Sequence, residues 1–544
     1  MRKLLIVLAL ICCSVSFAEA KNYYFNAKDG SDSNNGSVAS SPFKSFKKLS
    51  ELSLKAGDSV LLAGGVTFNE SLILKGLKGT LQNSIVITSY SMGKNNEQAK
   101  IDAKGFANGV LIQNCSFVEV KNLSITANGG KTEPVNGKLP DMRCGVLVTA
   151  NYAGKFTDIN LINLKIKDIY YEEVGFIRGK DEVKTANGTQ KYGWGIRFIN
   201  DTENALFENI KVEGCEISNV SHTGLKLTGR KESIQNIKLL NNKVIEVGGP
   251  GIQMSGVKTG LVSGNYVNGS GNKNDSRKWG RGSGLWTWGT SDVVIEKNSF
   301  LNANGPGDSA GCHIDYNCNN VIIQYNLSAN NAGGFCEILG NNYNCAYRYN
   351  ISVNDGYRVK GKNGAFQEGK IFWLSGYVGD KVKPKGPFNS YIYNNTIYTK
   401  SEMTAQVAVA TSAAGVLVAN NIFHIEGDSK FVAGDQLKAE SLNQVEIENC
   451  FFENNLFLKK SSWPKDVIIQ DDKPIYGDAK FTNKGGFKLE DYIPTNTSLI
   501  KDKGITINKI NNDNIGLVIG LKVEYDILGN KIKGKPDMGA IEIK

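Results

Sequence analysis

The chain has 544 residues, and 63 Lys and Arg against 53 Asp and Glu give a formal net charge of +10 at pH 7. This mild basic balance suits an anionic polysaccharide, whereas the absence of a basic helix or a known binding motif argues against nucleic acid as a partner. The cysteines after residue 20 form no CxxC pair, so a zinc site is not expected either.

Residues 1–20 have the features of a secretory signal peptide. Arg2 and Lys3 form the basic start, the run from Leu4 to Val15 is apolar, and Ala18-Glu19-Ala20 is a small-x-small cleavage site. The apolar run is too short to span a membrane, and no later segment approaches the required length. We therefore expect a protein exported to the periplasm or the extracellular space, without a membrane span and monomeric.

Residues 21–100 predict an N-terminal cap followed by the first rungs of a repeat. The segment opens with an extended YYF, continues through the turn-rich DGSDSNNG and reaches the amphipathic PFKSFKKL. A cap is expected because an open end of a solenoid leaves strand edges unpaired. Asp29 and Asp32 suit ordinary turns, and a structural calcium ion at this pair is the alternative. No organic cofactor is expected.

Residues 101–460 repeat a short apolar strand that ends at a fixed position, with a period of roughly two dozen residues that leaves room for about three strands and three turns per rung. Stacked Asn side chains at that position are able to hydrogen-bond from rung to rung. The pattern therefore predicts a solenoid of parallel strands, and its loss after residue 460 predicts that 461–544 wrap the last rungs. The position is occupied by Asn122, Asn163, Cys215, Asn242, Asn265, Asn298, Asn326, Asn350, Asn395, Asn421 and Asn455.

With this Asn column, the opening YYFNAKDGSDSNNG and the tail segments FKLEDYIPTNTSLIKDKG and DILGNKIKGKPDMGAIEIK, the chain resembles the pectate-lyase-like superfamily. The resemblance implies an all-β fold, a single-stranded right-handed parallel β-helix, in a secreted bacterial carbohydrate-active protein. That superfamily hosts lyases, hydrolases, epimerases and phage adhesins, so the function has to be argued from the site.

Alternation along the strands WGIRFI, TGLKLT, PGIQMS, SGLWTW and AGCHID separates inward from outward side chains. The inward positions are Ile196, Leu225, Ile252, Leu285 and Cys312, with Phe198, Leu227, Met254 and Ile314. One outward column contains Arg197, Lys226, Gln253, Trp286 and His313, and the second contains Ile199, Thr228, Ser255, Trp288 and Asp315. A one-residue slip in GFCEI adds Glu337 to the second column and buries Cys336 and Ile338.

Asp315 and Glu337 are then expected on adjacent rungs, about 4.8 Å apart at the backbone. Two carboxylates at this spacing fit a glycosidase that works by double displacement, with Asp315 as nucleophile and Glu337 as acid/base. The proximity of the two groups also separates their pKa values, as this chemistry requires. The alternative is that both are solvated surface carboxylates.

The other candidates lie on the same face or in the loops around it. Trp286 and Trp288 predict a platform for sugar rings, with packing beneath the following insert as the alternative. Asp308, in the turn before the His313 strand, is a further catalytic candidate at the mouth of the cleft, with an ordinary turn Asp as the alternative. His313 is a candidate on the outward face itself, and the loops 266–282, 301–310 and 357–370 are expected to form the walls of the cleft. The remaining substrate-binding candidates are Arg197, His222, Lys226, Lys278, Arg281 and Glu368.

The sequence thus predicts a secreted glycoside hydrolase that acts on a polysaccharide or a derived oligosaccharide, for which an anionic glycan is one candidate. Two alternatives stay open. A lyase acting on uronic-acid polymers would use Lys226 or His222 as its base, although no acidic cluster suited to calcium lies beside them in the sequence. A non-catalytic binding protein would need the tryptophans and the basic rim but no pair of carboxylates.

Overall fold

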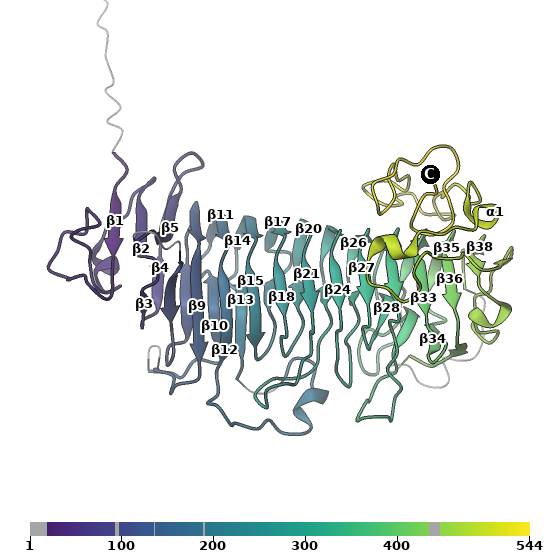
Figure 1. Ribbon diagram of the computed structural model, residues 1–544, viewed down its shortest axis with the longest axis horizontal. Helices are drawn as coiled ribbons and strands as arrows, with labels where there is room; N and C mark the ends of the chain where they lie inside the picture. Colours follow the sequence, from purple (N-terminus) through teal and green to yellow (C-terminus); the bar gives the residue numbers. More distant parts are fainter. Residues whose placement is uncertain (1–18, 93–96, 135–136, 189–190, 435–446) are drawn as a thin grey trace, which may run out of the picture.

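The computed structural model describes residues 19–92, 97–134, 137–188, 191–434 and 447–544. The predicted signal peptide lies, apart from its last two residues, outside this part of the chain. The strands stack along the long axis of an elongated molecule, from β1 at one end to β38 near the other (Figure 1). The described chain contains no helix with both the length and the apolar character needed to cross a membrane.

Within the described residues the strands form three long sheets in which each paired strand runs parallel to its neighbours. Sheet 1 consists, in spatial order, of β1 (Asn22–Phe25), β2 (Ser59–Ala63), β5 (Ile85–Tyr90), β8 (Val118–Lys121), β11 (Gly154–Ile162), β14 (Ala205–Glu213), β17 (Ile234–Leu240), β20 (Val257–Ser263), β23 (Ser291–Glu296), β26 (Asn319–Gln324), β29 (Ala346–Arg348), β32 (Phe388–Tyr393), β35 (Ala414–Ala419) and β38 (Cys450–Glu453). Sheet 2 consists of β4 (Leu72–Lys75), β7 (Asn108–Gln113), β10 (Arg143–Thr149), β13 (Gly193–Asn200), β16 (Leu225–Gly229), β19 (Ile252–Ser255), β22 (Leu285–Trp288), β25 (Cys312–Ile314), β28 (Gly334–Ile338), β31 (Lys370–Leu374), β34 (Thr404–Val409) and β37 (Asp428–Phe431). Sheet 3 consists of β3 (Thr67–Phe68), β6 (Ala99–Asp102), β9 (Leu123–Asn128), β12 (Lys165–Tyr170), β15 (Glu216–Val220), β18 (Lys243–Ile245), β21 (Tyr266–Asn268), β24 (Ser299–Leu301), β27 (Leu327–Ala329), β30 (Ile351–Val353), β33 (Thr396–Thr399), β36 (Ile422–Ile425), β39 (Leu456–Phe457) and β40 (Ile475–Tyr476).

Except at the two ends, each rung takes one strand from each sheet, and sequential rungs pair sheet by sheet, as a parallel β-helix requires. The predicted fold of three strands per rung is confirmed. The short helices lie between or after the rungs and are η1 (Lys48–Glu51), η2 (Glu182–Lys184), η4 (Lys460–Ser462), η5 (Leu489–Tyr492) and α1 (Thr497–Ile500).

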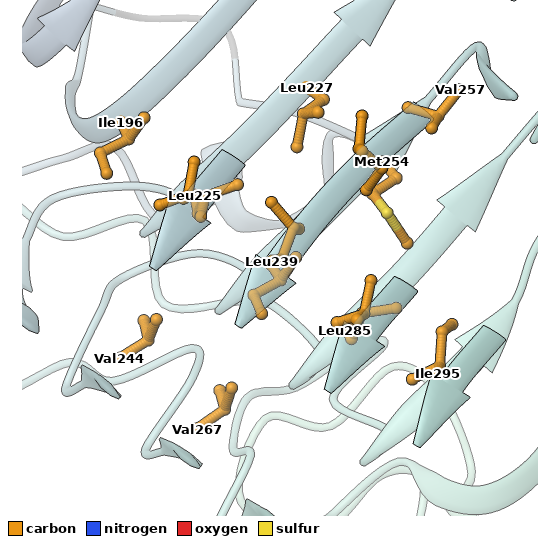
Figure 2. Close-up of a cluster of buried hydrophobic side chains, with 14 of the residues drawn as sticks. Ile196, Leu225, Leu227, Leu239, Val244, Met254, Val257, Val267, Leu285 and Ile295 are labelled. Atoms are coloured by element: carbon orange, nitrogen blue, oxygen red, sulfur yellow. The ribbon is translucent and has the colours of Figure 1, made fainter. Parts of the chain in front are cut away.

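The core runs through the middle of the stack and is built from the inward positions of the three sheets. The predicted inward residues of sheet 2 are all buried, and Leu225, Leu227, Met254 and Leu285 are at 0% exposure. Figure 2 shows these side chains pointing into one cluster with Leu239 and residues of the neighbouring sheets. A continuous core of this kind stabilises each rung through its neighbours, because no single rung encloses its own apolar face.

A ladder of buried Asn side chains connects the rungs at the turn after sheet 1. Each Asn Oδ1 accepts the backbone N–H and the Nδ2 of the Asn one rung earlier, and the ladder ends on Asp471. Cys215 takes the ladder position in its rung, as predicted, since its N–H donates to Asn242. The continuous part of the ladder comprises Asn242, Asn265, Asn298, Asn326, Asn350, Asn395, Asn421 and Asn455.

Two of the predicted members of the column lie elsewhere. Asn122 and Asn163 have φ values of 53° and 52°, which places them in the left-handed turn position one residue before the ladder. In these rungs the next residues, Leu123 and Leu164, are fully buried and make the ladder position apolar. Asn tolerates both positions, the left-handed turn because its short polar side chain lowers the steric cost, and this explains why sequence alone did not separate them.

The C-terminal residues pack against the outside of the last rungs (Figure 1). One cluster joins Ile500 and Met538 to Ile422 of sheet 3, and a second joins Ile510 and Leu517 to Tyr391 of sheet 1. The division at residue 460 stays a prediction, and β40 extends sheet 3 beyond it. Sheet 2 carries neither of these two clusters, so its outer face stays available for a site.

Candidate functional site

A cavity of about 1060 Å³ lies over the outer face of sheet 2. Its floor is formed by outward side chains of β16, β19, β22, β25, β28 and β31, and each of the three loops predicted as walls contributes one lining residue: Arg281, Asp308 and Gln367. The floor residues are Lys226, Thr228, Gln253, Ser255, Trp286, Trp288, His313, Asp315, Glu337 and Trp373. Eight of the twelve predicted site residues therefore line one cavity: Lys226, Arg281, Trp286, Trp288, Asp308, His313, Asp315 and Glu337.

The register of sheet 2 confirms the first predicted outward column as far as β25 and the second as far as β22. Arg197 pairs with Lys226, Lys226 with Gln253, Gln253 with Trp286, and Trp286 with His313. The second column runs through Thr228, Ser255 and Trp288. Side chains that are far apart in the chain thus follow one another along the cavity at the rung spacing of about 4.8 Å.

The predicted position of Glu337 in this register is wrong. Ala310 pairs with Gly334 and Ile314 with Ile338, so Glu337 follows His313 in the stack and lies diagonally to Asp315. The predicted register pairs Glu337 with Asp315, and the observed register pairs it with His313. The two registers differ by two residues, so both turn the same face inward and bury Cys336 and Ile338. The alternation of side chains therefore cannot distinguish them, and the carboxylate spacing expected from direct stacking does not apply.

Asp308 is held in place by three side chains from two loops. The Arg281 guanidinium donates from Nε to Oδ2 (2.8 Å) and from Nη2 to Oδ1 (2.9 Å). Gln367 Oε1 accepts the Asp308 N–H (2.5 Å), and Arg358 Nη1 donates to the Asp308 carbonyl (2.8 Å). Asp308 has a φ of 47°, the left-handed turn conformation that Asp adopts more readily than most residues.

The pKa values of Asp308 and Asp315 move in opposite directions. Burial alone would raise the pKa of Asp308, but Arg281, assisted by His313 and Arg358, holds it below its ordinary value. Burial raises the pKa of Asp315 to about 7, against the effect of His313, and the charges of Asp308 and Glu337 raise it further. Near neutral pH the cavity therefore contains one firmly ionised and one half-protonated Asp.

His313 and the two tryptophans connect the carboxylates to the rest of the floor. Ser283 Oγ lies 3.1 Å from His313 Nδ1, and burial lowers the pKa of this imidazole, so the ring is neutral at pH 7. The ring of Trp286 stacks toward it with centroids 5.9 Å apart. Trp288 is 45% exposed and leans on Tyr316 at 5.0 Å, which leaves an indole face open in the cavity.

Four predicted substrate-binding residues do not line the cavity. His222 was expected on the exposed face, but it is fully buried between the rings of Trp194 and Trp279, at 3.9 Å and 4.6 Å. Lys278 Nζ donates to the Glu246 carbonyl and to Asn274.

The other two residues, Arg197 and Glu368, also contact protein groups outside the cavity. Arg197 lies over the Trp194 ring at 4.2 Å, and Glu368 accepts the Lys360 N–H at 2.7 Å. In each of the four cases the side chain contacts protein groups around it instead of lining the cavity.

The sequence analysis gave no role to several residues that line the cavity, among them Gln253, Gln367 and Trp373. Gln253 was assigned to the correct column without a role, and Gln367 comes from a loop of irregular structure. Trp373 pairs with Glu337 across β28 and β31, so the alternation that located Glu337 also predicts an outward Trp373 one rung further. The signal for Gln253 and Trp373 was therefore present in the columns.

Among the described residues no group of three or more His, Cys, Asp or Glu is arranged to hold a metal ion. Asp32 accepts hydrogen bonds from the backbone of Lys44 and Ser45 and from Ser45 Oγ, which is turn chemistry. The calcium ion at Asp29 and Asp32 stays a prediction, and the eight described cysteines are free thiols.

Comparison with known proteins agrees with this architecture. A family model described as a right-handed β-helix region matches residues 194–366, which confirms the predicted hand of the solenoid. A lacto-N-biosidase from Bifidobacterium longum subsp. longum is 24% identical over 633 residues, covering 96% of this chain and 36% of that protein. The chain thus spans about a third of the length of this relative. The native crystal structure of a GH136 lacto-N-biosidase from Eubacterium ramulus aligns with a TM-score of 0.50 at 21% identity, covering 76% of this chain and 67% of that chain.

Proposed function

We propose that this protein is a glycoside hydrolase that cleaves an oligosaccharide or a polysaccharide in the cavity over sheet 2. The observation that carries the proposal is the pair Asp308 and Asp315, which line one cavity and have pKa values shifted in opposite directions. Glycosidic hydrolysis needs one ionised and one protonated carboxyl group on either side of the bond. The identity to a lacto-N-biosidase along 96% of the chain supports the same class of reaction.

The protonation pattern assigns the roles. Asp315 holds the proton and donates it to the leaving oxygen, while the Asp308 carboxylate, fixed by Arg281, faces the sugar carbon or the water that attacks it. Glu337 helps to keep the proton on Asp315 through its charge. This assignment replaces the predicted pair of Asp315 and Glu337, whose expected direct stacking the register does not provide.

The choice of a specific substrate rests on the similarity to the lacto-N-biosidase. Since the relative is a lacto-N-biosidase, we propose a glycan that contains a lacto-N-biose unit as the first substrate to try. The test incubates the wild-type protein with a chromogenic lacto-N-bioside and a panel of plant, algal and host glycans, and identifies the products by mass spectrometry. Products with saturated sugars and new reducing ends support hydrolysis. Unsaturated products that absorb in the ultraviolet would instead reveal a lyase, and binding without products a non-catalytic protein.

The pH dependence follows from Asp315. As a proton donor with a pKa of about 7, it is active below this pH and becomes inactive as the pH rises through it. We therefore expect kcat/KM to fall above about pH 7. A profile of kcat/KM between pH 4 and pH 10 checks this, with His313, Asp308 and Glu337 as the titratable neighbours. If kcat/KM instead falls as the pH decreases below about 7, Asp315 acts as the base, and the roles of Asp308 and Asp315 are exchanged.

The exposed indole of Trp288 is expected to bind a sugar ring. Trp288→Ala should raise KM by roughly tenfold with a much smaller change in kcat, because stacking contributes to binding more than to chemistry. Initial-rate kinetics measure both constants. Tyr266→Ala is the matched control, because Tyr266 is 37% exposed on β21 and is not among the residues that line the cavity. Equal KM values for the two variants would contradict a role of Trp288 in binding.

A further inference from the structure

One end of the cavity contains polar side chains that the protein itself leaves unsatisfied. Lys226 is only 7% exposed and lines the cavity, yet no hydrogen bond or ion pair joins its ammonium group to the described residues. The buried Thr228 Oγ1 and Gln253 Oε1 have no partner either. Since buried polar groups are normally paired, an unpaired set that faces a cavity points to a ligand.

The charge of this end is positive on balance, since Arg197, Lys226 and Lys231 outnumber Asp201 and Glu232. Arg197, one rung before Lys226, stacks on Trp194 with Lys226 beside the same ring, and its Nε is also unpaired. No carboxylate of the described chain lies within 4.0 Å of either cation. Burial lowers the pKa of Lys226 to about 7, and the charge of Arg197 contributes to this shift. Two partly desolvated cations without a counter-ion are costly, and an anion would remove that cost.

Other charged groups near this end are already engaged. Glu232 also lines the cavity, but its carboxylate accepts the Ser291 hydroxyl at 2.6 Å and lies 3.9 Å from Lys258. Lys231, the remaining charged group there, adds to the positive potential. A bound anion would therefore meet Lys226 from β16 and the Gln253 amide from β19, which is free to turn its NH₂ group toward it.

We propose that Lys226, with Thr228 and Gln253, binds an anionic substituent, a carboxylate or a sulfate, carried by the glycan. Three rung steps separate β16 from β25, so the anion binds about 14 Å from the Asp315 rung. The substituent therefore belongs to a sugar more than one unit away from the cleaved bond, with Trp286 and Trp288 beneath the units between. This inference deepens the proposed function and depends on a glycan occupying the cavity.

The test measures binding to matched pairs of oligosaccharides by calorimetry. The full-length Asp315→Asn protein is titrated with a sulfated oligosaccharide and its desulfated form, and with a uronate-containing oligosaccharide and its carboxyl-reduced form. We expect at least one anionic member to bind tenfold or more tightly than its neutral partner. The pair that shows the preference identifies sulfate or carboxylate as the substituent.

The Lys226→Met variant then tests whether Lys226 causes the preference for the anionic oligosaccharide. It should bind both members of the pair with the affinity of the neutral one, whereas Lys226→Arg should keep most of the preference. The Lys226→Met protein should melt at or above the wild-type temperature, because this substitution removes a desolvated cation that has no counter-ion. Equal affinities within every pair, or a Lys226→Met variant that loses the same factor for both members, would overturn the proposal.

Hydrolysis of the same panel by the wild-type protein separates this inference from the proposed function. Cleavage without any charge preference in binding would refute the anion site and leave the hydrolase in place. A charge preference that depends on Lys226, in a protein that cleaves nothing on the panel, would keep the anion site and count against the hydrolase.

Discussion

Asp315→Asn is expected to reduce kcat by roughly 10³-fold or more, because the variant has no proton to give to the leaving oxygen. Asn has nearly the shape of Asp, and the side chain of Asp315 faces the cavity, so the fold and the binding of glycan should be retained. Steady-state kinetics on a cleaved glycan measure the loss, and calorimetry with the same glycan measures the retained affinity. Asp308→Asn should cause a loss of similar size, because Arg281 then holds a neutral amide where the reaction needs a carboxylate.

Asp428→Asn is the matched control. Asp428 is an exposed carboxylate on β37 of the same sheet and is absent from the cavity lining, so its variant should keep the wild-type kcat. An Asp315→Asn enzyme with at least a tenth of the wild-type kcat would remove Asp315 from the chemistry. In that event Glu337→Gln becomes the informative variant, because Glu337 also lines the cavity and lies diagonally to Asp315.

Asn350→Leu is expected to lower the free energy of unfolding by about 4 kcal/mol, because several buried groups lose their partners at once. Asn350 is at 0% exposure, and its Oδ1 accepts the backbone N–H and the Nδ2 of Asn326, each at 3.0 Å. Its Nδ2 donates to the Ile323 carbonyl and to Asn395 Oδ1. Leu has a similar volume but replaces none of these four hydrogen bonds.

Denaturation by guanidinium chloride, followed by circular dichroism, measures the change. Asn304→Leu serves as the control, since Asn304 is exposed and its side chain accepts a hydrogen bond from the adjacent Gly305 N–H; we expect a change within about 0.5 kcal/mol. If the two variants unfold at the same denaturant concentration, the ladder contributes little to stability. Solenoid rungs depend on their neighbours, so the loss at Asn350 should also broaden the transition.

The sequence was sufficient for the repeating part of the molecule. The two-residue period of each strand decides which side chains face the core, and the period of roughly two dozen residues decides how many strands form a rung. The columns from Arg197 to His313 and from Thr228 to Trp288 followed from these two periods alone, and the register confirms them. Local alternation and chain order carry this information, and both are properties of the sequence.

The tertiary structure decided what the periods leave open. A shift of two residues keeps every side chain on its face, so only the packing of the rungs could place Glu337 beside His313 rather than Asp315. The same holds for the inserts: nothing local tells that Trp279 returns to cover His222, or that Arg281 reaches Asp308 across a loop. Contacts between segments distant in sequence depend on the path of irregular loops, and no repeating pattern encodes that path.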